Sequence, residues 1–374
     1  MKILWLSWKD EKHPQAGGAE VVSTELRKRL VRDGNEVILL TTKIPNSPTH
    51  EIVEGVDIYR IGGRYSVYIS AKKYFKKNLN SWPDLIIDEM NTIPFMGFSY
   101  SSTPTVLLTY QLAREVWFYQ MFFPVSIFGY LIEPLYLRCM SKKYLAVLTE
   151  SQSTKKDLTR YGFREADIDV FRVGMYTKPI KKYIPKKDTN KLIYLGSVRP
   201  MKRTLHLVKA FELAKNENPN LKLDIIGDWK NSKYGTKVHD YAEKSRYSGS
   251  IVFHGKVSQQ EKDKLLSDAT LIAITSIKEG WGLIATEAAA YGVSAVAYDS
   301  DGLRDSVLDQ KTGILVPSGD IKKLASVINK TLNDRVQLEI MGKSALENSR
   351  QYTFENSYSD FLSIIYRVME KHEK

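Results

Sequence analysis

Cysteine is almost absent from this sequence, with Cys139 the only one among 374 residues. A single thiol excludes an internal disulfide framework and fits a protein of a reducing compartment. Histidine is also scarce, with six residues scattered along the chain. No Cys-x-x-Cys pair, His-Glu-x-x-His motif or clustered Asp and His spacing occurs, so the sequence predicts no metal site.

Long apolar segments are missing as well. The apolar opening, residues 1–8, is too short for a signal peptide, and charged residues follow it at once. The charge-free stretch 116–132 is marginal for a membrane span and is interrupted by Pro124. We therefore predict a cytoplasmic protein without a transmembrane helix.

Two familiar nucleotide-binding signatures are also missing. No G-x-x-x-x-G-K-[ST] loop occurs, and the first expected βα turn, residues 15–20, lacks the G-x-G-x-x-G fingerprint of dinucleotide enzymes. A dinucleotide oxidoreductase is therefore disfavoured. The turn does carry Gly17 and Gly18, which would let a ligand approach the backbone, although a tight turn explains two glycines equally well.

The chain does contain apolar strand-like runs that alternate with amphipathic stretches. Its length exceeds what one hydrophobic core usually supports, so two domains are expected. The runs fall into two series, 2–8, 36–42, 84–88, 105–110 and 144–149, then 191–196, 221–227, 251–254, 271–275 and 294–299. We predict an α/β protein of two doubly wound, Rossmann-like domains.

A polar segment with two prolines, residues 174–187, separates the two series and is the expected linker. We place the first domain at 1–175 and the second at 176–354. Residues 355–374 carry apolar side chains at helical spacing.

The net charge of +12 is unevenly distributed. Residues 1–187 hold 28 basic and 19 acidic side chains, a net +9, and the remainder holds 27 and 24, a net +3. A basic first half suits anionic partners such as membrane lipids, a diphosphate-bearing acceptor or nucleic acid. A solvated lysine-rich surface explains the charge equally well, and no nucleic-acid-binding module is recognisable.

Two glutamates eight positions apart form the most informative motif. Glu279 follows the predicted strand 271–275, at the end where open α/β sheets bind ligands, and Glu287 falls within the next helix. Gly280 and Gly282 remove side chains where that helix begins, which leaves backbone N–H groups free to meet phosphate or sugar oxygens. The arrangement favours a sugar nucleotide as ligand.

This segment resembles the retaining family-4 glycosyltransferases of GT-B fold, in which two glutamates separated by seven residues lie in an EGFGL-like and EAMAxG-like frame. Trp281 stands where phenylalanine is usual. The resemblance implies that Glu279 lies by the donor sugar and Glu287 holds the ribose hydroxyls. It implies a central cleft between the domains, a last helix that crosses back to the first domain, and donor contacts from Gly280, Trp281, Gly282 and Leu283.

Two further stretches resemble the same family. The strand that ends at Gly196 leads into Arg199 and Lys202, matching an element whose arginine and lysine neutralise the leaving diphosphate. Ser197 occupies the family's arginine position, so Arg199 or Arg203 must substitute, or phosphate binding is weaker. Gly17 and Gly18 match a GG(A/S)E-like loop that faces the donor diphosphate and the acceptor.

The first domain departs from the family where a histidine often lies near the donor sugar. Tyr110 and Gln111 occupy that place, and none of the six histidines lies nearby. By family chemistry, front-face attack lets the departing phosphate take the acceptor proton, so no side-chain base is required. The acceptor candidates, each of which is as readily structural, are Gln111, Tyr110, Arg114, Asp88 and Asn91.

Residues 116–140 are unusually apolar and aromatic, and the basic runs 72–77 and 142–143 lie nearby in the sequence. They form either an interfacial patch or lipid-acceptor groove at an anionic membrane, or a buried helix pair that lines the cleft.

The favoured function is a metal-independent, retaining hexosyltransferase without a cofactor. It would move a hexose from a UDP- or GDP-linked donor onto a glycan or a lipid-linked saccharide. The alternatives are a sugar-nucleotide epimerase or phosphorylase of the same fold, and a basic membrane-surface or nucleic-acid-binding protein with a degenerate site. The sequence does not identify the sugar, the base, the acceptor, the linkage or the oligomeric state.

Overall fold

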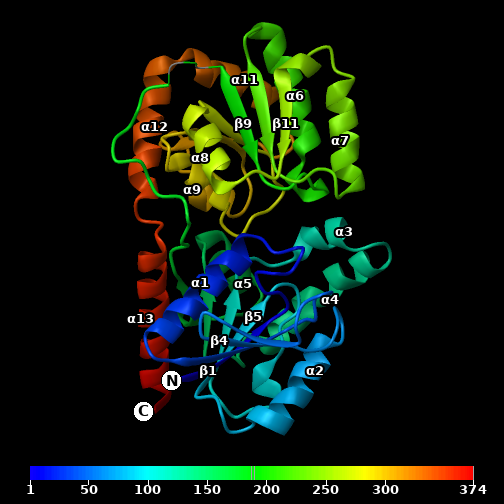
Figure 1. Cartoon of the computed structure of the whole chain (residues 1–374), viewed down its shortest axis with the longest axis vertical. Coiled ribbons are helices and arrows are strands. Elements are labelled where there is room, and N and C mark those ends of the chain that lie inside the picture. Colours follow the sequence, from blue (N-terminus) through cyan, green and yellow to red (C-terminus); the bar gives the residue numbers. More distant parts are fainter. Residues whose placement is uncertain (187, 189, 374) are drawn as a thin grey trace. The chain divides into compact units, whose positions relative to one another are not determined.

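The computed structural model describes residues 1–186, 188 and 190–373. The chain divides into two compact units (Figure 1). Unit 1 comprises Met1–Gly174 and Thr353–Lys374, and unit 2 comprises Met175–Tyr352. These limits lie one and two residues from the domain limits expected from the sequence.

Unit 1 contains an eight-stranded sheet of order β3-β4-β2-β1-β5-β6-β7-β8. The β3–β4 pair is antiparallel and the other neighbouring pairs are parallel. The strands are β1 (Lys2–Ser7), β2 (Glu36–Thr41), β3 (His50–Val53), β4 (Val56–Arg60), β5 (Leu85–Met90), β6 (Thr105–Thr109), β7 (Ala146–Thr149) and β8 (Ile168–Val170). The α-helices are α1 (Gly18–Arg32), α2 (Val67–Tyr74), α3 (Trp117–Gln120), α4 (Val125–Met140), α5 (Gln152–Arg160) and α13 (Phe354–Glu373).

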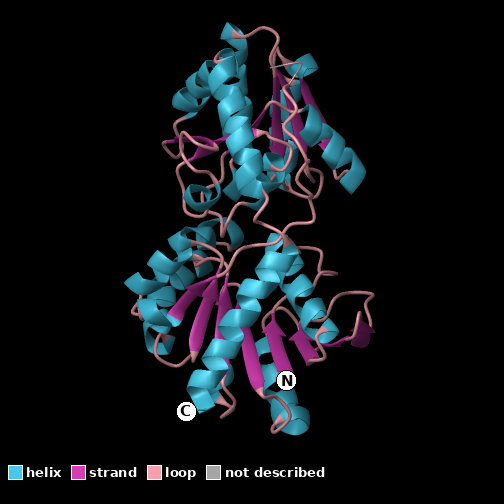
Figure 2. Cartoon of the chain, turned by 90° about the vertical axis from the view of Figure 1, so that its left-hand side faces the viewer, coloured by secondary structure: helices cyan, strands magenta, loops and turns pink. Residues whose placement is uncertain are grey.

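The last helix completes the core of unit 1. Figure 2 shows α13, which ends near the label C, lying across the magenta strands of this unit. Its Phe361 is fully buried, with its ring centroid 5.9 Å from that of Trp5 in β1. Arg172 and Asp360 form an ion pair of 2.6 Å that fixes the helix beside the end of β8. Residues at the two ends of the chain therefore share one hydrophobic core.

Unit 2 contains a six-stranded parallel sheet of order β11-β10-β9-β12-β13-β14. The strands are β9 (Lys191–Leu195), β10 (Lys222–Ile226), β11 (Ile251–Gly255), β12 (Leu271–Ile274), β13 (Ser294–Tyr298) and β14 (Gly313–Val316). The α-helices are α6 (Thr204–Glu217), α7 (Lys233–Glu243), α8 (Gln259–Asp268), α9 (Leu283–Ala289), α10 (Leu303–Ser306), α11 (Ile321–Asn333) and α12 (Arg335–Ser349).

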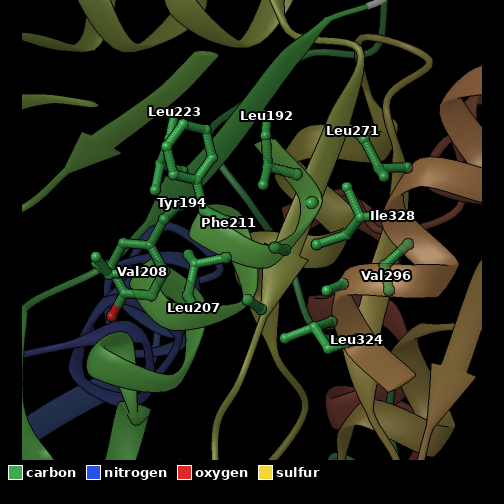
Figure 3. Close-up of a cluster of buried hydrophobic side chains, with 14 of the residues drawn as sticks. Leu192, Tyr194, Leu207, Val208, Phe211, Leu223, Leu271, Val296, Leu324 and Ile328 are labelled. Carbon is green, nitrogen blue, oxygen red and sulfur yellow. The ribbon is translucent and has the colours of Figure 1, made fainter. Parts of the chain in front are cut away.

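A cluster of buried side chains joins one face of this sheet to its helices (Figure 3). Leu192 of β9 and Val296 of β13 pack with Phe211 of α6 and Ile328 of α11, and each is at most 1% exposed. Because parallel strands are covered on both faces, they appear in the sequence as continuous apolar runs. For this reason, the ten strands that were predicted from such runs are all found in the structure.

The strand order places a switch point in each unit. In unit 2 the chain runs outward from β9 to β10 and β11, and then returns to β12 on the other side of β9. In unit 1, β1 is likewise flanked by β2 and β5. Loops at the carboxyl ends of the two strands diverge there, and open α/β sheets bind ligands in the resulting crevice. The loops after β9 and β12 in unit 2, and those after β1 and β5 in unit 1, are therefore the expected ligand-binding loops.

Candidate active site

At the switch point of unit 2, backbone hydrogen bonds hold the two loops together. The Thr275 hydroxyl donates to the carbonyl oxygen of Lys202 at 2.7 Å, and the N–H of Ile277 donates to that of Met201 at 2.9 Å. The turn after β9 is thereby fixed against the loop after β12. As a result, the Lys202 ammonium donates to the Glu279 carboxylate, and these side chains are 21% and 13% exposed. Two predicted site residues are thus in direct contact.

The loop that carries Glu279 is held by the loop after β13. The N–H of Glu279 donates to the carbonyl of Asp301 at 3.0 Å. Gly302 has φ +76°, and a Cβ there would lie 2.3 Å from the carbonyl oxygen of Glu279. Gly282 begins α9 with φ +93°. Both glycines are therefore required by the backbone, since L-residues rarely adopt such φ values.

The Trp281 side chain differs from the expectation of a donor contact. It is buried, its indole N–H donates to the Thr286 hydroxyl at 2.9 Å, and its ring lies 5.0 Å from that of Tyr352. The ring therefore supports the loop from the protein interior. Leu283 and Gly280, its neighbours in the motif, are half-buried.

Glu287 lies in α9 and is paired with a lysine that the sequence analysis did not single out. Its Oε1 accepts hydrogen bonds from the Lys262 ammonium at 2.7 Å and from the Thr177 hydroxyl at 3.4 Å. Glu287 and Lys262 are each 17% exposed. Lys262 is supplied by α8, so spacing within the glutamate motif gives no signal for it. A carboxylate in this place accepts hydrogen bonds from hydroxyls, as it does from that of Thr177.

Glycine backbone forms the ends of three adjacent strands in unit 2. Gly196, Gly227 and Gly255 follow or end β9, β10 and β11 with φ values of +130°, +138° and +70°. The N–H of Gly196 donates to the carbonyl of Ile226, and that of Gly227 to the carbonyl of Gly255. A ligand at these strand ends would meet backbone without intervening Cβ atoms.

We expect Gly227→Ala to destabilise unit 2 by about 2 to 4 kcal/mol, because it combines backbone strain with steric overlap. A Cβ at Gly227 would lie 2.1 Å from the carbonyl oxygen of Gly196. Chemical denaturation of the variant measures the change. Gly249→Ala is the matched control, since a Cβ there meets nothing within 4 Å. Equal stabilities of the two variants would contradict the prediction.

The two candidate arginines are placed differently. Arg199 is exposed at the start of the turn that carries Lys202. Arg203 is half-buried and donates to the Ser318 hydroxyl at 3.1 Å. Arg203 is therefore engaged within unit 2, whereas the exposed Arg199 side chain is accessible to a ligand.

In unit 1, the glycine turn is closed by Glu20. The carboxylate of Glu20 accepts from the N–H of Gly17 at 2.7 Å and pairs with the ammonium of Lys9 at 2.8 Å. Gly17 and Gly18 are exposed, and Gly17 has φ −146°, which any residue can adopt. A Cβ at Gly17 would meet only the Glu20 carboxylate, at 3.8 Å. A tight turn therefore does not require glycine at position 17.

A buried carboxylate at the end of β5 was missed by the sequence analysis. Glu89 is fully buried, accepts from the Trp5 indole N–H at 2.7 Å, and lies 3.7 Å from the Arg27 guanidinium. Burial raises its pKa to about 7, although Arg27 opposes that shift. Burial, with a smaller contribution from Glu89, also raises the pKa of the Tyr110 hydroxyl. The available signal was a pair of neighbouring acids, Asp88 and Glu89, inside an otherwise apolar strand.

This carboxylate predicts a pH-dependent stability. The folded protein retains a proton on Glu89 up to about pH 7, whereas the unfolded chain releases it near the ordinary value of 4.5. The free energy of unfolding should therefore fall as pH rises from 4.5 to 7, by at most about 1.4 kcal/mol per pH unit. Glu89→Gln should flatten that slope in denaturation series, and the exposed Glu115→Gln should not. Identical slopes for Glu89→Gln and the unmodified chain would contradict this assignment.

Asp88 and Arg114, two of the five acceptor candidates, have structural roles, and Tyr110 is buried with no hydrogen-bond partner for its hydroxyl among the described residues. Asp88 is fully buried and accepts from the N–H groups of Phe95 and Gly97 and from the Tyr144 hydroxyl. Arg114 donates to the carbonyl of Tyr130 in α4 and lies 4.1 Å above its ring. The Tyr110 side chain is only 6% exposed. As they stand, these side chains do not offer a surface to an acceptor.

Asn91 and Gln111 remain as acceptor candidates. Both are half-buried, at the ends of β5 and β6. The Asn91 Nδ2 and the Gln111 Oε1 are buried and have no hydrogen-bond partner among the described residues. A buried polar atom without a partner is costly, so a bound hydroxyl would be stabilised there.

An open hollow of about 240 Å³ also lies at the carboxyl ends of β1 and β2. Trp8, His13, Gln15, Lys43 and Arg64 are among its lining residues. An indole ring and the two cationic side chains of Lys43 and Arg64 suit a sugar that carries an anionic group. The hollow could not be predicted from the sequence, because its lining residues come from three separate loops.

Family models match both halves of the chain. Residues 177–348 match the model described as glycosyl transferases group 1, and residues 16–177 match that of glycosyltransferase family 4. The chain belongs to the family-4 glycosyltransferases. The two matches meet at residue 177, close to the boundary between units 1 and 2.

Curated relatives are similar over part of their length. A poly(glycerol-phosphate) alpha-glucosyltransferase of Bacillus subtilis is 26% identical over 181 residues, which cover 48% of this chain and 26% of the relative. A D-inositol 3-phosphate glycosyltransferase of Nocardioides is 25% identical over 214 residues, which cover 54% and 47%. The matched part therefore spans a quarter to a half of these relatives.

Solved structures show the fold along almost the whole chain. Sucrose-phosphate synthase of Thermosynechococcus elongatus aligns with a TM-score of 0.80 and 18% identity, covering 99% of each chain. HepE of Anabaena, solved in complex with UDP and glucose, aligns with a TM-score of 0.72 and 17% identity, covering 98% of this chain and 100% of HepE. The fold is GT-B, with two Rossmann-like domains, as predicted.

Proposed function

We propose that this protein transfers a hexose from a UDP- or GDP-linked donor to a glycan or a lipid-linked saccharide, with retention of configuration. The observation that carries the proposal is the meeting of Lys202, Glu279 and a glycine backbone at the switch point of unit 2. Relatives named as glycosyltransferases and the UDP and glucose bound by HepE support it. The single thiol supports a cytoplasmic location.

In the proposed reaction, unit 2 holds the donor. Glycine backbone at Gly196 and Gly227 lets the diphosphate approach closely, and Lys202 stabilises the charge that develops on it. Glu279 keeps the lysine in place and faces the sugar. Glu287, compensated by Lys262, accepts hydrogen bonds from ribose hydroxyls.

Unit 1 would hold the acceptor in the hollow beside the glycine turn. The acceptor hydroxyl oxygen forms a bond to the anomeric carbon on the face from which the diphosphate departs. The carbon–oxygen bond to the diphosphate breaks, and the departing phosphate oxygen takes the acceptor proton. This chemistry requires no side-chain base, metal ion or cofactor. Exposed glycine at position 17, which the turn itself does not require, leaves room for an acceptor beside the hollow.

The proposal is tested by measuring thermal stability of the chain with UDP, GDP and ADP and with their glucose, mannose, galactose and N-acetylglucosamine conjugates. A ligand that binds only the folded chain raises Tm in proportion to its affinity. We expect a rise with one nucleotide family, followed by transfer to a saccharide in an acceptor screen. No rise with any donor would contradict the assigned site.

A further inference from the structure

In the helix pair α3 and α4, apolar side chains are exposed and a charged side chain is buried, the reverse of an ordinary surface helix. The residues of α4 that face inward are Ser126, Gly129, Glu133, Leu137 and Met140, and those exposed between and beside them are mainly apolar. We call the apolar face six side chains of α4 and the turn before it, each 42% to 76% exposed, namely Phe122, Phe123, Ile127, Phe128, Leu131 and Leu135. Within unit 1, this face is therefore not buried.

Polar anchoring on the inner side fixes this orientation. Glu133 is 1% exposed and accepts from the N–H groups of Ala113 and Arg114 and from the Trp117 indole. The Trp117 ring lies directly over Gly129, where a Cβ would be 2.4 Å from it. Rotating α4 to bury its apolar face would break three hydrogen bonds to a buried carboxylate, which is unfavourable. The apolar face is thus held toward the outside.

Exposed cations lie on α4 itself and on the neighbouring elements of unit 1. The Arg64 guanidinium lies 3.8 Å from the Met121 sulfur, at the turn between α3 and α4. The Tyr68 ring of α2 lies 4.7 Å from that of Phe95, and the Tyr136 hydroxyl of α4 donates to the carbonyl of Thr92 at 2.6 Å, so both helices (Figure 1) contact the loop after β5. The exposed cations on α2, on the turn that follows it and at the end of α4 are Lys72, Lys73, Lys76, Lys77, Arg138, Lys142 and Lys143.

We propose that unit 1 docks on the surface of an anionic lipid bilayer through the apolar face, with these cations meeting the headgroups. Apolar side chains entering the interface beside basic ones are the pattern of surface-bound helices. No helix among the described residues is long and apolar enough to cross a membrane. Docking on the surface is therefore the arrangement that accommodates this face.

Charge favours a bilayer over a second copy of the chain. In a two-fold contact, the same patch meets itself, so the cations on α4 and its neighbouring elements would be brought together. Like charges at an interface are unfavourable, whereas anionic lipid is complementary to them. The inference extends the proposed function, since a lipid-linked acceptor would lie at such a surface. Vesicle binding needs neither donor nor acceptor, so the two proposals can fail separately.

The test is co-sedimentation of the full chain with vesicles of equal parts phosphatidylcholine and phosphatidylglycerol. We expect binding that weakens with added salt and with vesicles of phosphatidylcholine alone. Leu131→Glu combined with Leu135→Glu should reduce the affinity by at least about tenfold, because it removes apolar contact and adds like charge to the lipid. The control is Val336→Glu with Ile340→Glu on α12, an equally exposed apolar pair.

Thermal unfolding of both double variants establishes that they are folded. The proposal is overturned if the unmodified chain does not bind anionic vesicles, or if both double variants lose binding equally. Light scattering measures self-association in parallel. A dimer that disappears in the Leu131 and Leu135 variant, without vesicle binding by the unmodified chain, would assign the face to a second copy and likewise overturn the proposal.

Discussion

Replacing Lys202 with alanine is expected to lower kcat by about 10²- to 10³-fold, which is the usual loss when one donor to a developing anion is removed. Lys202 is held at the switch point by the Thr275 hydroxyl and pairs with Glu279. Its ammonium would stabilise the departing diphosphate, whose charge increases as the sugar is transferred. The loss should therefore appear in kcat more than in KM.

The measurement is steady-state transfer with the donor identified by thermal stability. Lys237→Ala provides the control, because Lys237 is an exposed lysine on α7 of the same unit. Its kinetics should match those of the unmodified chain. If Lys202→Ala retains the same kcat, then Lys202 does not assist departure of the diphosphate, and the exposed Arg199 becomes the next residue to test.

Replacing Glu287 with alanine should weaken donor binding by about tenfold to a hundredfold. A charged hydrogen bond contributes about 1.5 to 3 kcal/mol when water is excluded. Removing the carboxylate also leaves the Lys262 ammonium without the partner that it has at 2.7 Å. The ribose hydroxyls should lose the carboxylate that accepts their hydrogen bonds. Titration calorimetry should therefore show a larger Kd for the nucleotide itself and not only for the sugar conjugate.

Glu261→Ala is the matched control for this experiment, because Glu261 is an exposed carboxylate on α8 beside Lys262. It should leave the Kd unchanged. An equal loss in both variants would mean that overall charge, and not contact with ribose, governs affinity. A normal Kd for Glu287→Ala would remove Glu287 from the donor site altogether.

The sequence predicted the central strands of both sheets for a physical reason. Strands covered on both faces are continuous apolar runs, and glycines mark their ends. The four strands that it missed lie toward the sheet edges. In β3 every second residue is exposed, and β8 has only three residues. The runs of buried residues that revealed most of the predicted strands are therefore absent from β3 and β8.

Side-chain partners were harder to predict than strands. Glu279 and Lys202 were both named, and the structure brings them into contact. Lys262 was missed, because its pairing with Glu287 depends on how α8 packs beside α9. Trp281 matched the family position, yet its direction is decided by Thr286 and Tyr352. Motif spacing gives no information on such tertiary contacts.

Neighbouring acids in β5 show the same limit. Successive side chains of a strand point to opposite faces, so Asp88 and Glu89 enter different surroundings. Asp88 binds the loop that follows β5, whereas Glu89 meets Trp5 and Arg27. The sequence alone did not distinguish which of the two would face the switch point.

The position of α13 has a consequence for synthesis on the ribosome. Protein domains usually fold in the order in which they emerge. Here Trp5 is translated before unit 2 and its partner Phe361 after it, so unit 2 lies wholly between them. Unit 2 can therefore finish folding before unit 1 receives its last helix. Until α13 is translated, the nascent sheet of unit 1 must wait with part of its core exposed, which is the interval in which chaperones would be needed.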